Sequence, residues 1–241
     1  MVQFLISNEV DVIILLGFLL FFTFFSIKSK ALDRNGVLIA NSVGLIVFLL
    51  GGLTNFLAIT VFFLIAEVST RYSGIKTDIK HSKRTTGNII GNSAAAIIAL
   101  FLTGFVGPVL AGIGFYSAVS AALADTVSSE IGLTSKKKPV LITNFKSVAP
   151  GTDGAITLKG TIAGVTAAIV IAVYYYYFDP SLITAIAIVL AGFVGMNVDS
   201  VLGALLERKK ILNNTQVNFL GSLSGMIAGI ILSQVLILTG L

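Results

Sequence analysis

The sequence predicts an all-α fold, a polytopic bundle of transmembrane helices that forms one domain over residues 1–241. The first observation is composition: 56% of the 241 residues are hydrophobic and 11% are charged, whereas soluble domains carry about 25% charged residues. The mean hydropathy of +0.99 agrees with this class. The second observation is the recurrence of long apolar segments, and the third is the placement of basic residues between them.

Eight apolar segments approach the roughly 20 residues that are needed to cross the hydrocarbon core of a bilayer. A soluble chain of this length cannot bury so many apolar segments on all sides. Glycines at 51–52 and in the stretch 104–108 mark tight turns between neighbouring segments. In order, the predicted spans are Val10–Ile27, Val37–Gly52, Asn55–Arg71, Asn88–Leu102, Val106–Glu130, Thr157–Phe178, Leu182–Leu206 and Val217–Leu238.

The basic residues predict the orientation of these spans. All sixteen Lys and Arg residues lie in or beside four alternate connections, near 28–36, 71–87, 131–156 and 207–216. The positive-inside rule therefore predicts that both termini lie outside and that the four basic connections form a cytoplasmic active face. We expect the plasma membrane as the location. The chain has no Cys and a single His, which excludes disulfides and a zinc site built from several such ligands.

The stretch ALADTVSSEIG, residues 122–132, places Asp125 and Glu130 at the inner end of the fifth predicted span. A charged side chain in the membrane costs about 2.5 kcal/mol or more, so such residues usually face a polar cavity. On a helix, Asp125, Ser128 and Ser129 share one face, and hard oxygen ligands of this kind suit Mg²⁺. Alternatively, these groups hydrogen-bond between helices or pair with a lysine at the interface.

Asp199 lies in the seventh predicted span, within the stretch GFVGMNVDSVLGALLE. Gly192, Gly195 and Gly203 lie on the same stripe of this helix, and small residues let helices pack closely in lipid. Close packing explains the glycines, but it does not explain an aspartate among them. We therefore expect Asp199 to point into the bundle.

The segment KSVAPGTDGAITLKGT, residues 146–161, is the longest glycine-rich polar stretch, and it opens the sixth predicted span. Backbone N–H groups in such a loop at a helix N-terminus favour phosphate binding. The order of its Lys and Gly residues differs from that of a Walker A motif. The predicted phosphate-binding residues here are Lys146, Gly151, Thr152, Gly154 and Lys159.

Two further polar stretches lie at the inner ends of spans. SKRTTGNIIGN, residues 82–92, brings two adjacent cations before two asparagines that lie one helical turn apart. The cations are alternatively ordinary anchors at the membrane surface, whereas buried amides need hydrogen-bond partners. LNNTQVNF, residues 212–219, brings more amides to the start of the eighth span. The predicted nucleotide-binding set therefore also contains Lys83, Arg84, Asn88, Asn92, Ser129, Asn214 and Asn218.

Five stretches together, RTTGNIIGN, ALADTVSSEIG, PGTDGAITLKGT, MNVDSVLGALLE and NNTQVNF, resemble in order and spacing the DUF92 family of integral membrane proteins. The resemblance runs from about Leu32 to the C-terminus. It implies a family whose plant members include phytyl phosphate kinase, within a wider group similar to phytol and dolichol kinases and CDP-diacylglycerol synthases. The implied activity is CTP-dependent phosphorylation of a prenyl phosphate with Mg²⁺. Glu207 departs from the pattern, which has Gln after the DSxLGA element.

The residues and the resemblance together predict phosphoryl transfer at the cytoplasmic leaflet, because this reaction mainly needs positioning and charge neutralisation. Asp125 and Glu130 are predicted to hold Mg²⁺, and Asp199 is predicted to complete or orient that metal site. The predicted catalytic residues are Asp125, Lys146 and Asp199. The expected partners are a prenyl phosphate, a nucleoside triphosphate and membrane lipid, with no nucleic acid.

Three other functions stay open at this point. The same residues suit a CTP-linked lipid cytidylyltransferase, which releases pyrophosphate, or a prenol kinase. An ion-coupled transporter also places Asp and Glu within the membrane. The sequence contains no convincing inverted repeat and no polar groups near the outer face, where alternating access needs a gate. A kinase is therefore the preferred interpretation.

Overall fold

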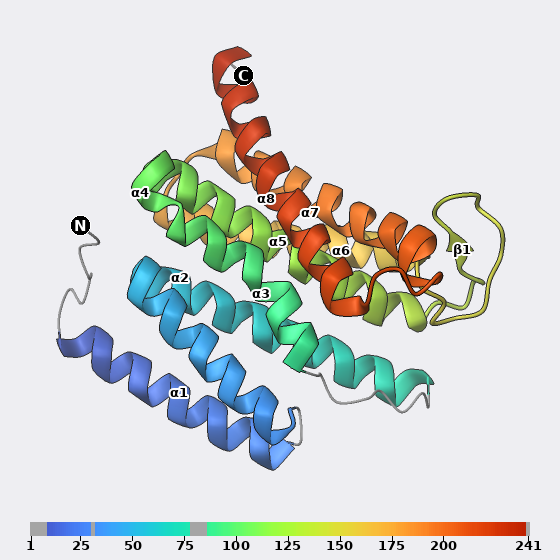
Figure 1. The fold of residues 1–241 in the computed structure, drawn as a ribbon, viewed down its shortest axis with the longest axis horizontal. Helices are drawn as coiled ribbons and strands as arrows, with labels where there is room; N and C mark the ends of the chain where they lie inside the picture. The colour runs from blue at the N-terminus through green and yellow to red at the C-terminus, as the bar shows by residue number, and fades with distance from the viewer. Residues whose placement is uncertain (1–8, 30–31, 78–85, 240–241) are drawn as a thin grey trace.

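The computed structural model describes residues 9–29, 32–77 and 86–239, and this part of the chain is almost entirely helical (Figure 1). The helices are α1 Glu9–Ser29, α2 Arg34–Thr77, α3 Thr86–Phe101, α4 Thr103–Val106, α5 Pro108–Leu133, α6 Leu158–Phe178, α7 Leu182–Leu202 and α8 Asn214–Thr239, with a π-helical turn, η1, at Gly203–Glu207. Two short strands, β1 Val140–Leu141 and β2 Ala155–Ile156, pair antiparallel in the connection between α5 and α6. The sequence did not predict this strand pair.

Helix α2 consists of two arms that meet at Gly52. The backbone there has φ 75° and ψ −173°, a conformation that glycine adopts at little cost. Figure 1 shows the second arm running back beside the first. The Tyr174 hydroxyl donates to the Thr54 carbonyl at 2.7 Å, and the Tyr116 hydroxyl donates to Asn55 Oδ1 at 2.8 Å. These hydrogen bonds attach the turn to α6 and α5. The break at Gly52 lies at the pair of glycines where the sequence predicted a turn.

Six helices within the described residues are long and apolar enough to cross a membrane: α1, α2, α5, α6, α8, and α7 together with η1. Helix α3 is apolar but has 16 residues, and the two arms of α2 count as one helix among the six. The predicted class, an all-α membrane bundle, is therefore confirmed. The number of eight spans and the outside location of both termini stay predictions.

Helix α5 is the central helix of the bundle, because it packs against α2, α3, α6, α7 and α8. Its middle, residues 113–124, is buried without interruption. Glycines on the neighbouring helices permit this close packing, since a Cβ added at Gly195 on α7 or at Gly225 on α8 would clash with Ala121. Such small-residue contacts are typical of helices in lipid. They hold the helices close enough for side chains near their ends to face one shared space.

Candidate active site

A polar pocket opens at the end of the bundle where α5 and α7 end and where α6 and α8 begin. Its walls come from these four helices, from η1 and from the connection between α5 and α6. The pocket has a cavity volume of about 250 Å³ and is partly open to solvent. Eight residues that the sequence predicted for the site line this polar pocket: Asp125, Ser129, Gly151, Thr152, Gly154, Asp199, Asn214 and Asn218.

Two carboxylates from facing helices meet in the polar pocket. Asp125 on α5 and Asp199 on α7 interact through their side chains, and Asp199 Oδ2 is buried without a hydrogen-bond partner. Gly221 on α8 leaves room for this pair, since a Cβ there would lie 2.9 Å from the Asp199 Cβ. Both residues are half-buried, and two adjacent carboxylates that are partly shielded from water repel each other unless a cation or a shared proton lies between them. The pair therefore suits either a shared proton or a bound cation.

The π-helical turn η1 brings a third carboxylate to the same pocket. The Arg208 N–H donates to the Gly203 carbonyl at 3.2 Å, five residues earlier. Two α-helical turns take about 7.2 residues, and the i→i+5 bond of a π-turn adds about one residue. Glu207 follows Asp199 by eight residues, so the π-turn returns it to the face that carries Asp199. Glu207 accordingly lines the polar pocket.

Amide side chains connect Glu207 to the start of α8. Asn218 Nδ2 donates to Asn214 Oδ1 at 3.4 Å, and the Asn214 side chain hydrogen-bonds to Glu207. These two hydrogen bonds connect Asn218, Asn214 and Glu207 along the pocket wall. A glutamine at position 207 would retain an oxygen that accepts from Asn214.

The glycine-rich loop docks on η1 and forms one wall of the polar pocket. Gly154 has φ 73°, and a Cβ there would lie 2.5 Å from the Ser200 carbonyl oxygen and would clash with Ala204. The Ile142 N–H donates to the Gly154 carbonyl at 3.1 Å, which attaches the loop to the segment that follows β1. Gly151 also has a positive φ, 80°, but nothing lies near its missing side chain. The loop therefore needs glycine at both positions, and at Gly154 it needs the space as well.

The N-terminus of α6 borders the same wall through Thr157, Gly160 and Thr161. The Thr157 hydroxyl accepts from the Gly160 N–H at 3.0 Å and caps the helix. A helix N-terminus favours anions, because its backbone N–H groups and its dipole present positive charge. The loop and the helix end together suit an anionic ligand.

The cations of the site differ from those that the sequence predicted. Lys159 Nζ donates to the Thr134 hydroxyl at 2.5 Å and to the Thr134 carbonyl at 3.3 Å, and neither Lys146 nor Lys159 lines the polar pocket. Lys137, in the turn after α5, does line it. In the sequence, Lys137 counted only among the basic residues that predict the orientation of the spans. The signal that could have identified it is the run KKKP, residues 136–139, which follows the helix that carries Asp125. Asp153, within the GTDG element, is a further lining residue that was missed.

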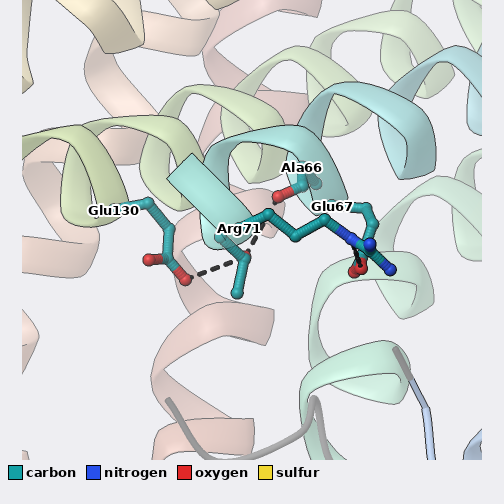
Figure 2. Close-up of polar contacts among 5 residues, drawn as sticks. Ala66, Glu67, Arg71 and Glu130 are labelled. Carbon is teal, nitrogen blue, oxygen red and sulfur yellow. Dashed lines mark hydrogen bonds and ion pairs between the residues drawn. The ribbon is translucent and has the colours of Figure 1, made fainter. Parts of the chain in front are cut away.

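Glu130 lies away from the polar pocket, toward the second arm of α2 (Figure 2). Glu130 Oε1 accepts from the Thr70 hydroxyl at 2.9 Å. Beside this contact, Arg71 Nε pairs with Glu67 Oε1 at 2.7 Å along α2. Five residues separate Asp125 from Glu130, which corresponds to about 140° around an α-helix. The structure therefore does not bring Glu130 together with Asp125 and Asp199.

Asn88 and Asn92 line a different cavity, an apolar groove between α1, α2 and α3. The contact between α3 and α8 is tight where the two helices meet, since a Cβ at Gly91 would lie 2.6 Å from the Thr215 carbonyl oxygen. Asn88 and Asn92 line a different cavity from Asn214 and Asn218, although α3 and α8 are in contact. The predicted residues Lys83 and Arg84 lie outside the described part of the chain.

The donor set of the polar pocket fits Mg²⁺. Within the described ranges, no group of three or more His, Cys, Asp or Glu residues has the arrangement of a metal site. Mg²⁺ usually takes one or two protein carboxylates and fills its remaining positions with phosphate oxygens and water. Asp125 and Asp199 supply that number, and the buried Asp199 Oδ2 has an unused acceptor position.

The fold and the site define a helical integral membrane protein with a polar, acid-containing pocket at one end. The chain belongs to the family described as Integral membrane protein DUF92, whose model matches residues 17–227. The resemblance that the motifs indicated is thereby confirmed.

Three relatives show how widely this family extends. The chain is 36% identical over 208 residues to the uncharacterized membrane protein MJ0933 of Methanocaldococcus jannaschii, which covers 85% of this chain and 87% of that protein. It is 30% identical over 218 residues to the chloroplast protein VTE6 of Arabidopsis thaliana, covering 84% and 66% of the two chains. It is 30% identical over 198 residues to the uncharacterized membrane protein sll0875 of Synechocystis, covering 76% and 75%. No solved structure matches the chain.

Proposed function

We propose that this protein is a membrane-embedded kinase that transfers a phosphoryl group from CTP to a prenyl monophosphate of the phytyl or geranylgeranyl type. The observation that carries the proposal is the Asp125–Asp199 pair, with its unpartnered buried oxygen, in a polar pocket walled by a glycine-rich loop. The family membership supports it, because the motif resemblance implies phytyl phosphate kinase among the plant members. The substrates, the nucleotide and Mg²⁺ are part of the proposal.

The charges in the polar pocket support metal-dependent binding. Four carboxylates and one lysine line it: Asp125, Asp153, Asp199, Glu207 and Lys137. This set repels the phosphates of a nucleotide unless divalent cations accompany them. Mg²⁺ held by Asp125 and Asp199 would neutralise charge on the transferring phosphoryl group. The two carboxylates would thus act together as metal ligands.

The backbone of the pocket supports phosphate binding. The loop at residues 151–154 and the first turn of α6 line the cavity, and we assign phosphate binding to backbone N–H groups of these segments. Donors that are already held in place stabilise developing charge without reorganisation. Holding both phosphates in line supplies most of what phosphoryl transfer requires.

The chemistry needs no strong general base at the pocket. An oxygen of the prenyl monophosphate is already an anion, and it attacks the terminal phosphorus of the nucleotide. The bond from that phosphorus to the bridging oxygen breaks, and the nucleoside diphosphate leaves with the electron pair. The products are a prenyl diphosphate and CDP. We further propose that the pocket faces the cytoplasm, in agreement with the basic residues in the connections around it.

The test is incubation of the purified protein with phytyl or geranylgeranyl phosphate, Mg²⁺ and each of the four nucleoside triphosphates in turn, followed by analysis of the lipid products. We expect lipid diphosphate and CDP with CTP, and no product when Mg²⁺ is removed with a chelator. A CDP-lipid with release of pyrophosphate would instead identify a cytidylyltransferase. Conversion of the free prenol alone would identify a prenol kinase. The absence of any lipid product with all four nucleotides would refute the proposal.

A further inference from the structure

Lys137 lines the polar pocket, whereas its neighbours Lys136 and Lys138 do not. Among the described residues that line the pocket, Lys137 is the only Lys or Arg. We propose that Lys137 binds a phosphoryl group of a substrate at the rim of the pocket. This inference rests on the proposed function, and it assigns to one lysine the role that the sequence had given to Lys146 and Lys159.

The turn that carries Lys137 is held on both sides. Ser135 Oγ accepts from the Lys137 backbone N–H at 3.2 Å and donates to the Lys137 carbonyl at 3.1 Å. Just before it, Thr134 accepts two hydrogen bonds from Lys159 Nζ at the start of α6. Just after it, Pro139 is buried. The backbone of Lys137 is therefore fixed at the pocket rim, and its exposed side chain is available to a ligand.

The other described cations near the pocket are placed elsewhere. The ammonium group of Lys159 contacts Thr134, and Lys146 lies exposed in the turn after β1. Arg208, Lys209 and Lys210 follow η1, are exposed and do not line the cavity. Among the described cations, Lys137 is thus the one that a phosphate in this pocket meets. Its ammonium group offers three hydrogen-bond donors to phosphate oxygens and offsets part of the negative charge of the four lining carboxylates.

Phosphate oxyanions enter the proposed reaction from two sources, the triphosphate of the nucleotide and the phosphate of the prenyl substrate. Both present the same chemistry to an ammonium group, and both must come close to Asp125 and Asp199 for transfer. The structure therefore assigns the ligand class, a phosphoryl group, and the experiment must separate the two sources.

The test compares Lys137→Ala with Lys136→Ala, which removes the same charge from the adjacent side chain that does not line the pocket. Lys137→Arg keeps the charge. The first readout is binding of inorganic pyrophosphate to the purified protein in detergent with Mg²⁺, measured by calorimetry, which requires no turnover. We expect Lys137→Ala to weaken binding about five- to tenfold. Lys136→Ala is expected to weaken it less than about twofold, and Lys137→Arg to retain most of it.

Steady-state kinetics then separates the two sources. A higher KM for CTP in Lys137→Ala assigns the lysine to the triphosphate, and a higher KM for the prenyl phosphate assigns it to the acceptor. Equal effects of Lys137→Ala and Lys136→Ala on pyrophosphate binding and on both KM values would overturn the inference. If the wild-type protein forms no lipid diphosphate, the proposed function fails, and the pyrophosphate comparison still decides the role of Lys137.

Discussion

The polar pocket and the apolar groove lie in parts of the chain that pack differently. The polar pocket lies among α5, α6, α7 and α8, where small residues bring helix backbones close together. The groove lies among α1, α2 and α3, where phenylalanine rings form much of the wall. Phe22 and Phe63, for example, pack edge to face with their centroids 4.4 Å apart.

This difference has a physical consequence for function. Close backbones leave room for short polar side chains and loop N–H groups, so Asp125, Asp199 and the loop at Gly154 meet in one space. Aromatic packing fills space with apolar surface, so the wall around Asn88 and Asn92 is mostly apolar. The charged and polar side chains in its wall therefore make the polar pocket the better candidate for a phosphate ligand.

The largest expected effect comes from removing one carboxylate of the polar pocket. Asp125→Asn retains the shape of the side chain but loses the charge that a cation requires, so kcat should fall by about a hundredfold or more. Thermal stability should hold or rise, because the repulsion between Asp125 and Asp199 is relieved. Both quantities are measured on the same preparation across a Mg²⁺ titration.

Glu130→Gln is the matched control on the same helix. It removes the same charge, but Gln Oε1 still accepts from Thr70, so kcat should stay within about threefold of wild type. Equal losses in Asp125→Asn and Glu130→Gln would restore Glu130 to the metal site that the sequence predicted. Wild-type turnover and an unchanged Mg²⁺ midpoint in Asp125→Asn would contradict the assignment of Asp125 as a metal ligand.

The second effect concerns docking of the glycine-rich loop. Gly154→Ala combines a strained positive φ with a clash against Ala204 and the Ser200 carbonyl, so it should destabilise the protein by about 2–4 kcal/mol. Gly151→Ala has similar backbone strain but open space around the new Cβ, so its cost should be about 1–2 kcal/mol. The melting temperatures of the two variants in detergent measure the difference. Identical melting temperatures would show that the contact of Gly154 with η1 contributes nothing.

A smaller effect is expected at Glu207. Glu207→Gln keeps an acceptor for Asn214, so activity should change by less than about threefold. Glu207→Leu removes that acceptor and should lower activity further, because Asn214 then loses its partner in the pocket wall. Turnover of the two variants at saturating substrate makes the comparison. A loss in Glu207→Gln as large as in Asp125→Asn would show that the charge itself is required.

The smallest effect is expected in the apolar groove. Asn92→Leu replaces an amide by an apolar side chain of similar size among apolar neighbours, so turnover and the KM for CTP should both stay within about twofold of wild type. Stability should be unchanged or slightly higher. A tenfold rise in the KM for CTP would instead join the groove residues to the nucleotide site, as the sequence predicted.

The helical class and the approximate positions of the membrane helices follow from the sequence alone. The sixth span was predicted at Thr157–Phe178 and α6 is Leu158–Phe178, while the turn predicted at Gly51–Gly52 is the break in α2. These features are local, because the length of an apolar segment and a glycine turn can be read from neighbouring residues. The family could also be recognised from the motifs. Asp125 and Asp199 were singled out because polar groups in apolar segments are costly and therefore conspicuous, and the glycine loop was singled out by its glycine-rich polar composition.

Only the tertiary structure decided which polar residues share a cavity. Glu130 follows Asp125 by five residues and turns to α2, and the π-turn brings Glu207 to the face of Asp199. Lys137 lines the polar pocket and Lys159 does not, because Thr134 holds the ammonium group of Lys159. The physical reason is that the direction of a side chain depends on which helix packs beside it. That choice is made by contacts between residues far apart in the sequence, such as Gly195 and Gly225 with Ala121.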